Sequence, residues 1–519
     1  MALLTITGVS LVILASLFIY THVLEPLLFS SQAKIPGPKA YALTKWRLAL
    51  EDGRGTRTRT VDQLHQRYGP VVRTGPNEVS FNNLAGLRTI YGPGSPYGRT
   101  DFYRMFDVYG RQNLFTFHSV TAHGRRKRLV SHAYSKTAVV RGPVAAMVEA
   151  KAAAYMQLLA TAGPEGGGVS DVFETLHWYS WTPSRRSCMA GTGRRRPCKG
   201  DVVDPARWRL SWFAVHWPGL TKWLYTRTGW MESAVRPLLP MQKPATYTGI
   251  RKFALEAYRR SESEAKQGVV HDDQPQSILE RLLDVQSSEK NQEKLDGLDI
   301  ASECADHLLA GIDTTSDTLM FLIWALSRPQ NRRYQDRLRD EVRGIPEASL
   351  SSTSSMIPTV EASDRCTYLG AVIKETLRLY SPLPASEPRS VAADSAIDGF
   401  AIPAGTTVGA SPFSLHRNPD VFRNPLVWDP DRWLDEENPE KLAEMNRWFW
   451  AFSSGGRMCI GLHLAMAEMT TLAAAIYRKY QTSLAPGFED VAPGITSRFE
   501  VFSDDIFSKV AVGALHPAP

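Results

Sequence analysis

Residues 452–461, which read Phe-Ser-Ser-Gly-Gly-Arg-Met-Cys-Ile-Gly, constrain this chain more than any other segment. Cys459 lies just before 462–480, an apolar stretch with helical periodicity. A helix N-terminus offers free backbone N–H groups and a positive dipole end, and both favour a thiolate. The surrounding glycines allow a tight loop and the close approach of a large flat group, while Arg457 offers a cation to an acidic group. The segment therefore predicts a functional thiol loop.

The rest of the chain predicts one large, mainly α-helical body with small β-sheets. The 13 Trp, 18 Tyr and 20 Phe exclude a mainly disordered chain, and the odd set of five cysteines argues against a disulfide framework. Expected helices cover 144–160, 247–264, 277–286, 301–326 and 368–380, and expected strands cover 71–74, 78–81 and a run from 396–402 through 405–408. No repeat or long low-complexity linker divides the body, which we place at 47–519.

The first 30 residues predict a membrane anchor. Residues 3–20 carry no charge and 21–29 continue mostly apolar, which suffices for a span of ~20 residues. A cleaved signal peptide is the alternative, but residues 1–7 lack the basic residues that it requires. The hinge and linker 31–46 contains Pro36 and Pro38, which stop the helix. Basic residues after the anchor place the body on the cytoplasmic side: Lys34, Lys39, Lys45 and Arg47.

Residues 181–203 do not fit the pattern around them. Residues 181–200 hold six basic residues, no acidic residue, and two cysteines, Cys188 and Cys198, without the spacing of a metal site. Outside 181–200 the chain has 54 basic and 53 acidic residues, so the net charge of +7 is no evidence for nucleic-acid binding. Synonymous codons for 181–193, read in a neighbouring frame, encode an amphipathic helical peptide. We therefore hypothesise a local frameshift, which sequencing of the transcript would test.

Residues 296–327 would form one helix of about 50 Å if helical throughout. Residues 310–315 interrupt this pattern with Ala-Gly-Ile-Asp-Thr-Thr, which contains poor interior helix residues. Helix propensity alone slightly favours a polar turn between two helices. The alternative is a deliberate weak point where a ligand approaches the backbone.

The segment 452–461 resembles the haem-binding loop of the cytochrome P450 family, Phe-x-x-Gly-x-Arg-x-Cys-x-Gly. The matched positions are Phe452, Gly455, Arg457, Cys459 and Gly461. This resemblance implies the cytochrome P450 fold with haem b, Cys459 as the proximal iron ligand and Arg457 as a partner of a haem propionate. A thiolate ligand favours O–O cleavage.

Two further segments extend the resemblance. Residues 310–315 match the family's oxygen-binding signature, which implies that Ala310 and Gly311 lie against haem. It gives Asp313 and Thr314 the acid–alcohol role in proton delivery. The family's Glu-x-x-Arg and Pro-x-Arg-Phe/Trp elements imply a buried structural triad: Glu375, Arg378 and Arg432.

His123 and Lys127 align with the family's propionate-binding Trp-x-x-x-Arg helix but depart from it at both positions. An exposed basic helix is the alternative, and Arg389 is the better propionate candidate. Residues 125–128 are all basic and would form a docking face for an acidic reductase. The resemblance also assigns substrate contacts, with core packing an equal alternative: Phe102, Tyr103, Phe106, Leu383 and Ser386.

The sequence thus predicts a haem-thiolate monooxygenase anchored by one span in the endoplasmic reticulum membrane, with its catalytic domain facing the cytoplasm. Electrons would come from NADPH through cytochrome P450 reductase, with cytochrome b5 as a second partner. The substrate would be a lipophilic small molecule of fungal secondary metabolism. Alternatives are a fatty-acid or xenobiotic hydroxylase, a haem-thiolate isomerase or dehydratase, a member impaired by 181–203, and a non-catalytic haem-binding or basic interaction protein.

Overall fold

The computed structural model describes residues 2–161, 170–172, 175–177, 179–180, 245–267, 276–288, 294–352 and 354–489, with short pieces at 231, 234, 511–512 and 516–517. The anomalous segment 181–203 lies outside the described residues. The expected helices are present as α8 (Gly142–Thr161), α13 (Ala245–Lys266), α14 (Ile278–Ser287), α15 (Gly297–Ser327), α18 (Thr367–Leu379) and α21 (Leu462–Lys479).

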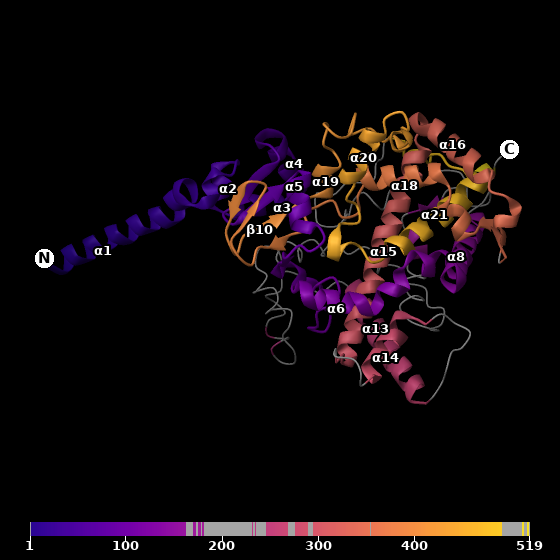
Figure 1. Cartoon of the computed structure of the whole chain (residues 1–519), viewed down its shortest axis with the longest axis horizontal. Helices are drawn as coiled ribbons and strands as arrows, with labels where there is room; N and C mark the ends of the chain where they lie inside the picture. The colour runs from indigo at the N-terminus through magenta and orange to yellow at the C-terminus, as the bar shows by residue number, and fades with distance from the viewer. Residues whose placement is uncertain are drawn as a thin grey trace.

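Helix α15 runs through the middle of the body (Figure 1). Its C-terminal half is buried against α18 and α21, and α8 packs on α21, so that these helices form the largest hydrophobic core. Its N-terminal half packs against α13 and α14 in a second core. The mainly helical prediction is therefore confirmed.

The prediction of a polar turn in α15 is wrong, because the helix is continuous from Gly297 to Ser327. The Thr314 and Ser316 hydroxyls donate hydrogen bonds to the carbonyls four residues earlier, at 2.9 and 2.8 Å. The hydroxyl groups of Thr314 and Ser316 thus find their hydrogen-bond acceptors within the helix. Burial of the apolar C-terminal half outweighs the weak local propensity.

A five-stranded sheet lies beside the helices and joins segments that are distant in the chain (Figure 1). Its order is β1 (Val71–Gly75), β2 (Glu78–Phe81), β10 (Thr407–Gly409), β7 (Arg389–Ser390) and β3 (Gly98–Arg99). The antiparallel pairing of β3 with β7 sets Arg99 opposite Arg389. This sheet edge therefore brings two arginines together.

The run expected over 396–408 is not one strand. Strands β8 (Ser395–Ile397) and β9 (Phe400–Ile402) pair as a hairpin, while β10 belongs to the five-stranded sheet. Asp398 and Gly399 have positive φ angles of 51° and 78°, which suit a tight hairpin turn. The turn reverses the chain where the sequence pattern looked continuous.

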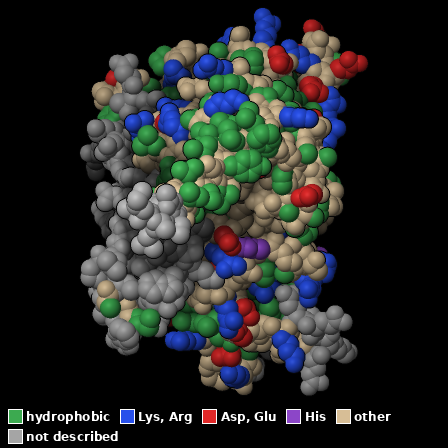
Figure 2. All heavy atoms as spheres, turned by 90° about the vertical axis from the view of Figure 1, so that its left-hand side faces the viewer, with side chains coloured by type: hydrophobic (Ala, Val, Ile, Leu, Met, Phe, Trp, Pro, Cys, Tyr) green, Lys and Arg blue, Asp and Glu red, His purple; other side chains and the backbone are tan. Residues whose placement is uncertain are grey.

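The N-terminal segment forms α1 (Ala2–Ile19) and the π-helical η1 (Tyr20–Phe29), and α1 projects from the body (Figure 1). The range Thr7–Phe29 is long and apolar enough to cross a membrane, a property that signal sequences share. The far end of this segment is fixed to the body, because Arg73 Nη1 donates to the Pro26 carbonyl at 2.7 Å. Figure 2 shows hydrophobic side chains gathered on this side of the molecule, with Lys and Arg around them.

Candidate active site

The cysteine loop is a tight turn before α21. Residues Gly455–Arg457 form one 3₁₀ turn, and the Cys459 N–H donates to the Phe452 carbonyl at 2.9 Å. Gly455 has φ +63°, and a Cβ there would lie 2.3 Å from the Tyr91 carbonyl oxygen. Only glycine fits this position, which explains one fixed element of the sequence motif.

Cys459 is exposed, whereas the other described cysteines, Cys304 and Cys366, are buried. Desolvation by the surrounding protein atoms raises the pKa of Cys459, although the backbone N–H groups at the start of α21 and the charge of Lys127 oppose this. A metal ion would overcome the raised pKa, because a coordinating thiol loses its proton. The described residues contain no group of three His, Cys, Asp or Glu side chains that could hold a metal ion.

Three buried or partly buried arginines gather beside the loop: Arg99, Arg389 and Arg457. Nε and Nη1 of Arg99 and of Arg457, and Nη1 of Arg389, have no hydrogen-bond acceptor within the described part of the chain. Burial and the neighbouring arginines lower the pKa of Arg99 to about 10 and that of Arg457 to about 9. Such a group of donors suits an anion with several acceptor oxygens.

These arginines and the cysteine loop fit haem. The two haem carboxylates would supply the missing acceptors, and the exposed Cys459 thiol would supply a ligand to the haem iron. Arg99 is a residue that the sequence analysis missed, because its place in the group depends on strand pairing with Arg389, 290 positions later in the chain.

The helix α6 (Val120–Val130) carries His123 and Lys127. His123 is buried, and burial together with Arg457 and other cations lowers its pKa to about 3, so the ring is neutral at physiological pH. Lys127 Nζ donates to the carbonyls of Gly456 and Met458, both at 3.0 Å. Lys127 therefore contacts the cysteine loop itself.

Asp313 and Thr314 lie on α15. The Thr314 hydroxyl donates to the Ala310 carbonyl at 2.9 Å. Asp313 Oδ1 lies 3.9 Å from Nε2 of the buried His177, which also lies 3.7 Å from Asp317 Oδ1. No sequence motif indicates His177, because only tertiary packing brings it to α15.

The three residues of the expected triad are in contact. Glu375 and Arg378 are fully buried, and Glu375 Oε1 accepts from Arg378 Nη2 at 2.8 Å and from Arg432 Nε at 3.1 Å. The indole N–H of Trp433 also donates to Glu375, at 2.9 Å. The carboxylate thus ties α18 to η9 (Pro430–Leu434), a segment ahead of the cysteine loop in the chain.

The expected substrate residues fall into two environments. Phe102, Tyr103 and Phe106 are buried and pack edge to face with each other and with Phe115, and the Arg99 guanidinium lies 4.4 Å from the ring centroid of Tyr103. Leu383 and Ser386 are partly exposed, and the Ser386 hydroxyl faces Gly409, where a Cβ would lie 2.1 Å away.

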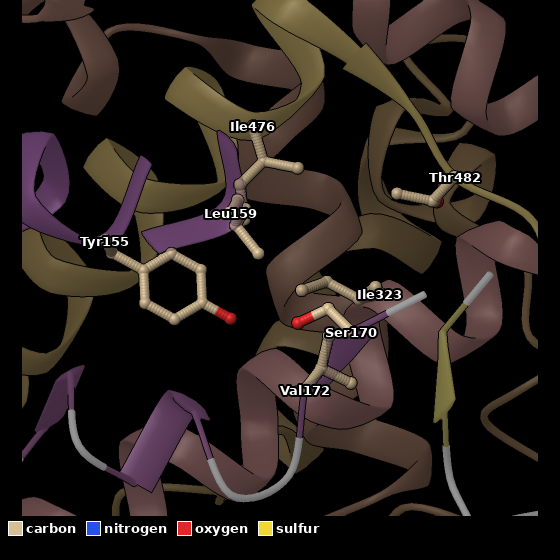
Figure 3. A pocket seen from close by; sticks show the side chains of 7 residues that line it. All are labelled: Tyr155, Leu159, Ser170, Val172, Ile323, Ile476 and Thr482. Carbon is tan, nitrogen blue, oxygen red and sulfur yellow. The ribbon is translucent and has the colours of Figure 1, made fainter. Parts of the chain in front are cut away.

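A small apolar cavity lies elsewhere, in the core between α8, α15 and α21 (Figure 3). Its lining consists of Tyr155, Leu159, Ser170, Val172, Ile323, Ile476 and Thr482. None of the predicted site residues lines it, so we regard it as a packing feature of the main core.

Comparison with known proteins agrees with this geometry. The cytochrome P450 family model matches residues 238–497. The cytochrome P450 monooxygenase FGM1 of Gibberella zeae is 26% identical over 468 residues, covering 87% of this chain and 86% of that protein. The monooxygenases stcB of Emericella nidulans and tazI of Aspergillus terreus are 28% and 29% identical, covering 87% and 88% of this chain and 82% and 89% of those proteins.

The fold and the thiol loop define a haem-thiolate oxidoreductase. The chain belongs to the cytochrome P450 family, and it is a monooxygenase of the kind found in fungi.

Proposed function

We propose that this monooxygenase inserts one oxygen atom of O2 into a lipophilic small molecule of fungal secondary metabolism, using electrons from NADPH. The observation that carries the proposal is the exposed Cys459 thiol beside three arginines with unsatisfied N–H groups. The names of the fungal relatives support the reaction class.

Cys459 Sγ would bind the haem iron, and Arg99, Arg389 and Arg457 would bind the haem carboxylates. Haem b with a thiolate ligand supplies the activation of dioxygen. Phe452, Gly455 and Gly461 would shape the loop that carries the thiol, and Ala310 and Gly311 would contact the haem.

Proton delivery would run along α15. The Thr314 hydroxyl keeps its oxygen free to accept a hydrogen bond while it donates to Ala310. Asp313 can pass a proton from its carboxyl group toward Thr314. His177 Nε2 lies 3.9 Å from Asp313 Oδ1, which is too far for a direct hydrogen bond, so a proton would pass between the two groups through one bridging water.

The N-terminal segment would anchor the enzyme by one span in the endoplasmic reticulum membrane. The fixed end of this segment at Pro26 and the hydrophobic surface around it support the proposal. Lys34 and the basic residues after it would leave the catalytic domain in the cytoplasm.

A reductase would dock on the exposed side of α6. Arg125 and Arg128 are exposed, but Arg126 is buried and its Nη1 lies 2.7 Å from Glu303 Oε2. Arg126 is therefore not part of the docking face expected over 125–128. Cytochrome P450 reductase is the proposed partner, and cytochrome b5 could use the same basic surface.

The reduced carbon-monoxide difference spectrum tests the proposal. Wild-type protein should show the strongly red-shifted Soret band of a thiolate ligand, and Cys459→Ser should lose it completely. Cys366→Ser, which changes a buried cysteine, should keep the band. Folded, haem-loaded wild-type protein without this band would refute the proposed function.

A further inference from the structure

Lys127 stands where the family's motif has an arginine, and its contacts differ from those that the motif implies. Its ammonium donates to the carbonyl oxygens of Gly456 and Met458, each at 3.0 Å. Met458 immediately precedes Cys459. Lys127 thus holds the backbone of the loop on the side that leads into the thiol.

The rest of the loop is held by other contacts. The Ser453 hydroxyl donates to Glu387 Oε2 at 3.1 Å, and the Ser454 hydroxyl donates to the Tyr91 carbonyl at 3.3 Å. Gly456 and Met458, by contrast, are exposed. Between them, Arg457 Nη2 donates to the carbonyls of His118 and Ser119 at 3.1 and 3.2 Å, so the Lys127 bonds are the second side-chain link between this part of the loop and α6.

The haem carboxylates do not require Lys127. Five nitrogen atoms of Arg99, Arg389 and Arg457 have no acceptor among the described residues and can serve the carboxylates. A lysine ammonium is a compact charge with three donors, which suits two converging carbonyls, whereas the planar fork of arginine suits a carboxylate. The lysine at position 127 therefore suits the two loop carbonyls, whereas the arginine of the family's motif suits a haem carboxylate.

Helix α6, which carries Lys127, is itself attached to α15 by a buried hydrogen bond. The residue before Lys127, Arg126, bonds through Nη1 to the fully buried Glu303 of α15 at 2.7 Å. Glu303 also accepts the backbone N–H of Leu114 at 3.0 Å. The position of Lys127 is thus fixed relative to α15.

We propose that Lys127 is a positioning residue that clamps the cysteine loop to α6 and holds Cys459 in place as the iron ligand. This inference rests on the proposed function, in which Cys459 binds haem. It assigns Lys127 to the loop backbone and not to a haem carboxylate.

The test compares Lys127→Met with Lys136→Met in haem-loaded protein reduced by dithionite under carbon monoxide. Lys136 is an exposed lysine whose Nζ contacts Asp364 at 2.8 Å, so its loss removes the same charge away from the loop. In mild urea, Lys127→Met should convert from the thiolate band to the blue-shifted band about tenfold faster than wild type, the effect of losing a charge-assisted hydrogen bond. Lys127→Arg should be intermediate, and Lys136→Met should match wild type.

Transfer of haem to apomyoglobin distinguishes the clamp from a carboxylate contact. The clamp predicts that Lys127→Met transfers haem at a rate within about twofold of wild type, because the carboxylate partners remain. Faster haem transfer with an unchanged rate of band conversion would overturn the inference, and so would band conversion equal to that of Lys136→Met. If Lys127→Met fails to load haem, amide hydrogen exchange of 455–461 in the Lys127→Gln holoprotein decides: faster exchange supports the clamp and unchanged exchange overturns it. A wild-type protein without the thiolate band would instead refute the proposed function.

Discussion

Arg378 of the buried triad and the three arginines beside the cysteine loop (Arg99, Arg389 and Arg457) carry the same kind of charge but differ in their hydrogen bonds. All five N–H groups of Arg378 have acceptors: the two oxygens of Glu375 at 2.9 and 2.8 Å, and the carbonyls of His416, Pro425 and Val427 at 2.7 to 3.1 Å. In the group of Arg99, Arg389 and Arg457, five nitrogen atoms have no acceptor in the described part of the chain.

The difference separates charges that build the fold from charges that bind a ligand. A buried charge is tolerated where the chain itself supplies its partners, as around Glu375. A group of like charges with unused donors is costly until an anion arrives, which is why the pKa of Arg457 and that of Arg99 are lowered by burial and by neighbouring arginines. The charges around Glu375 should therefore control the stability of the fold. The arginines beside the cysteine loop should control haem binding.

The largest expected effect is on the Glu375 group. Glu375→Gln leaves the buried Arg378 without its counter-charge, and loss of one partner of a buried pair costs about 3–5 kcal/mol. We expect the free energy of unfolding, measured by urea denaturation of the holoprotein, to fall by that amount.

An exposed ion pair provides the matched control. Glu361 lies 2.7 Å from Arg141, with both side chains partly or largely exposed. Glu361→Gln should have the same unfolding midpoint as wild type, because solvent screens such pairs. Equal destabilisation by the two substitutions would show that burial does not distinguish them.

The next effect is on haem retention. Arg99→Met keeps the packing against Tyr103 and Phe115 but removes two unsatisfied donors and one repulsive charge. The stability of the apoprotein should not fall, whereas transfer of haem to apomyoglobin should become about a hundredfold faster, as expected for losing charge-assisted bonds to a carboxylate. Thermal unfolding of the apoprotein and the transfer rate together check this prediction.

The opposite pattern would place Arg99 with the structural charges. In that case Arg99→Met would lower the melting temperature of the apoprotein and leave haem transfer unchanged. Its pairing with Arg389 across β3 and β7 would then serve the sheet rather than the cofactor.

The sequence predicted the features that depend on residues close together in the chain. The cysteine loop, Glu375 with Arg378, and most helices each depend on residues within one turn or one helical face. Arg99 and His177 could not be predicted, because strand pairing and helix packing bring them to Arg389 and Asp313 from distant positions. The helical pattern over 301–326 predicted α15, whereas helix propensity alone slightly favoured a turn at 310–315; burial of the helix overrides that local propensity.

The same contrast between satisfied and unsatisfied charges occurs within α15, between two acidic residues three positions apart. Glu303 accepts the Leu114 N–H and lies beside His307 and Arg126; burial raises its pKa, but His307 and Arg126 outweigh burial and hold the pKa below the usual range. Asp306 accepts the Phe115 N–H at 3.3 Å, and burial raises its pKa to about 7.

Asp306 should therefore make stability depend on pH. Because its pKa is higher in the folded than in the unfolded protein, the folded state binds more protons between pH 4 and 7, and the free energy of unfolding falls as pH rises through this window. Asp306→Asn keeps an acceptor for Phe115 but cannot ionise, so it should become about 2–3 kcal/mol more stable relative to wild type between pH 5 and pH 8. His307, whose pKa is raised by Glu303 despite burial, contributes a change of the same sign in both proteins. Parallel pH profiles of the melting temperature for wild type and Asp306→Asn would contradict this prediction. They would mean that the charge of Asp306 is stabilised by its neighbours as well as that of Glu303. The difference between charges with and without partners would then hold for the arginines alone.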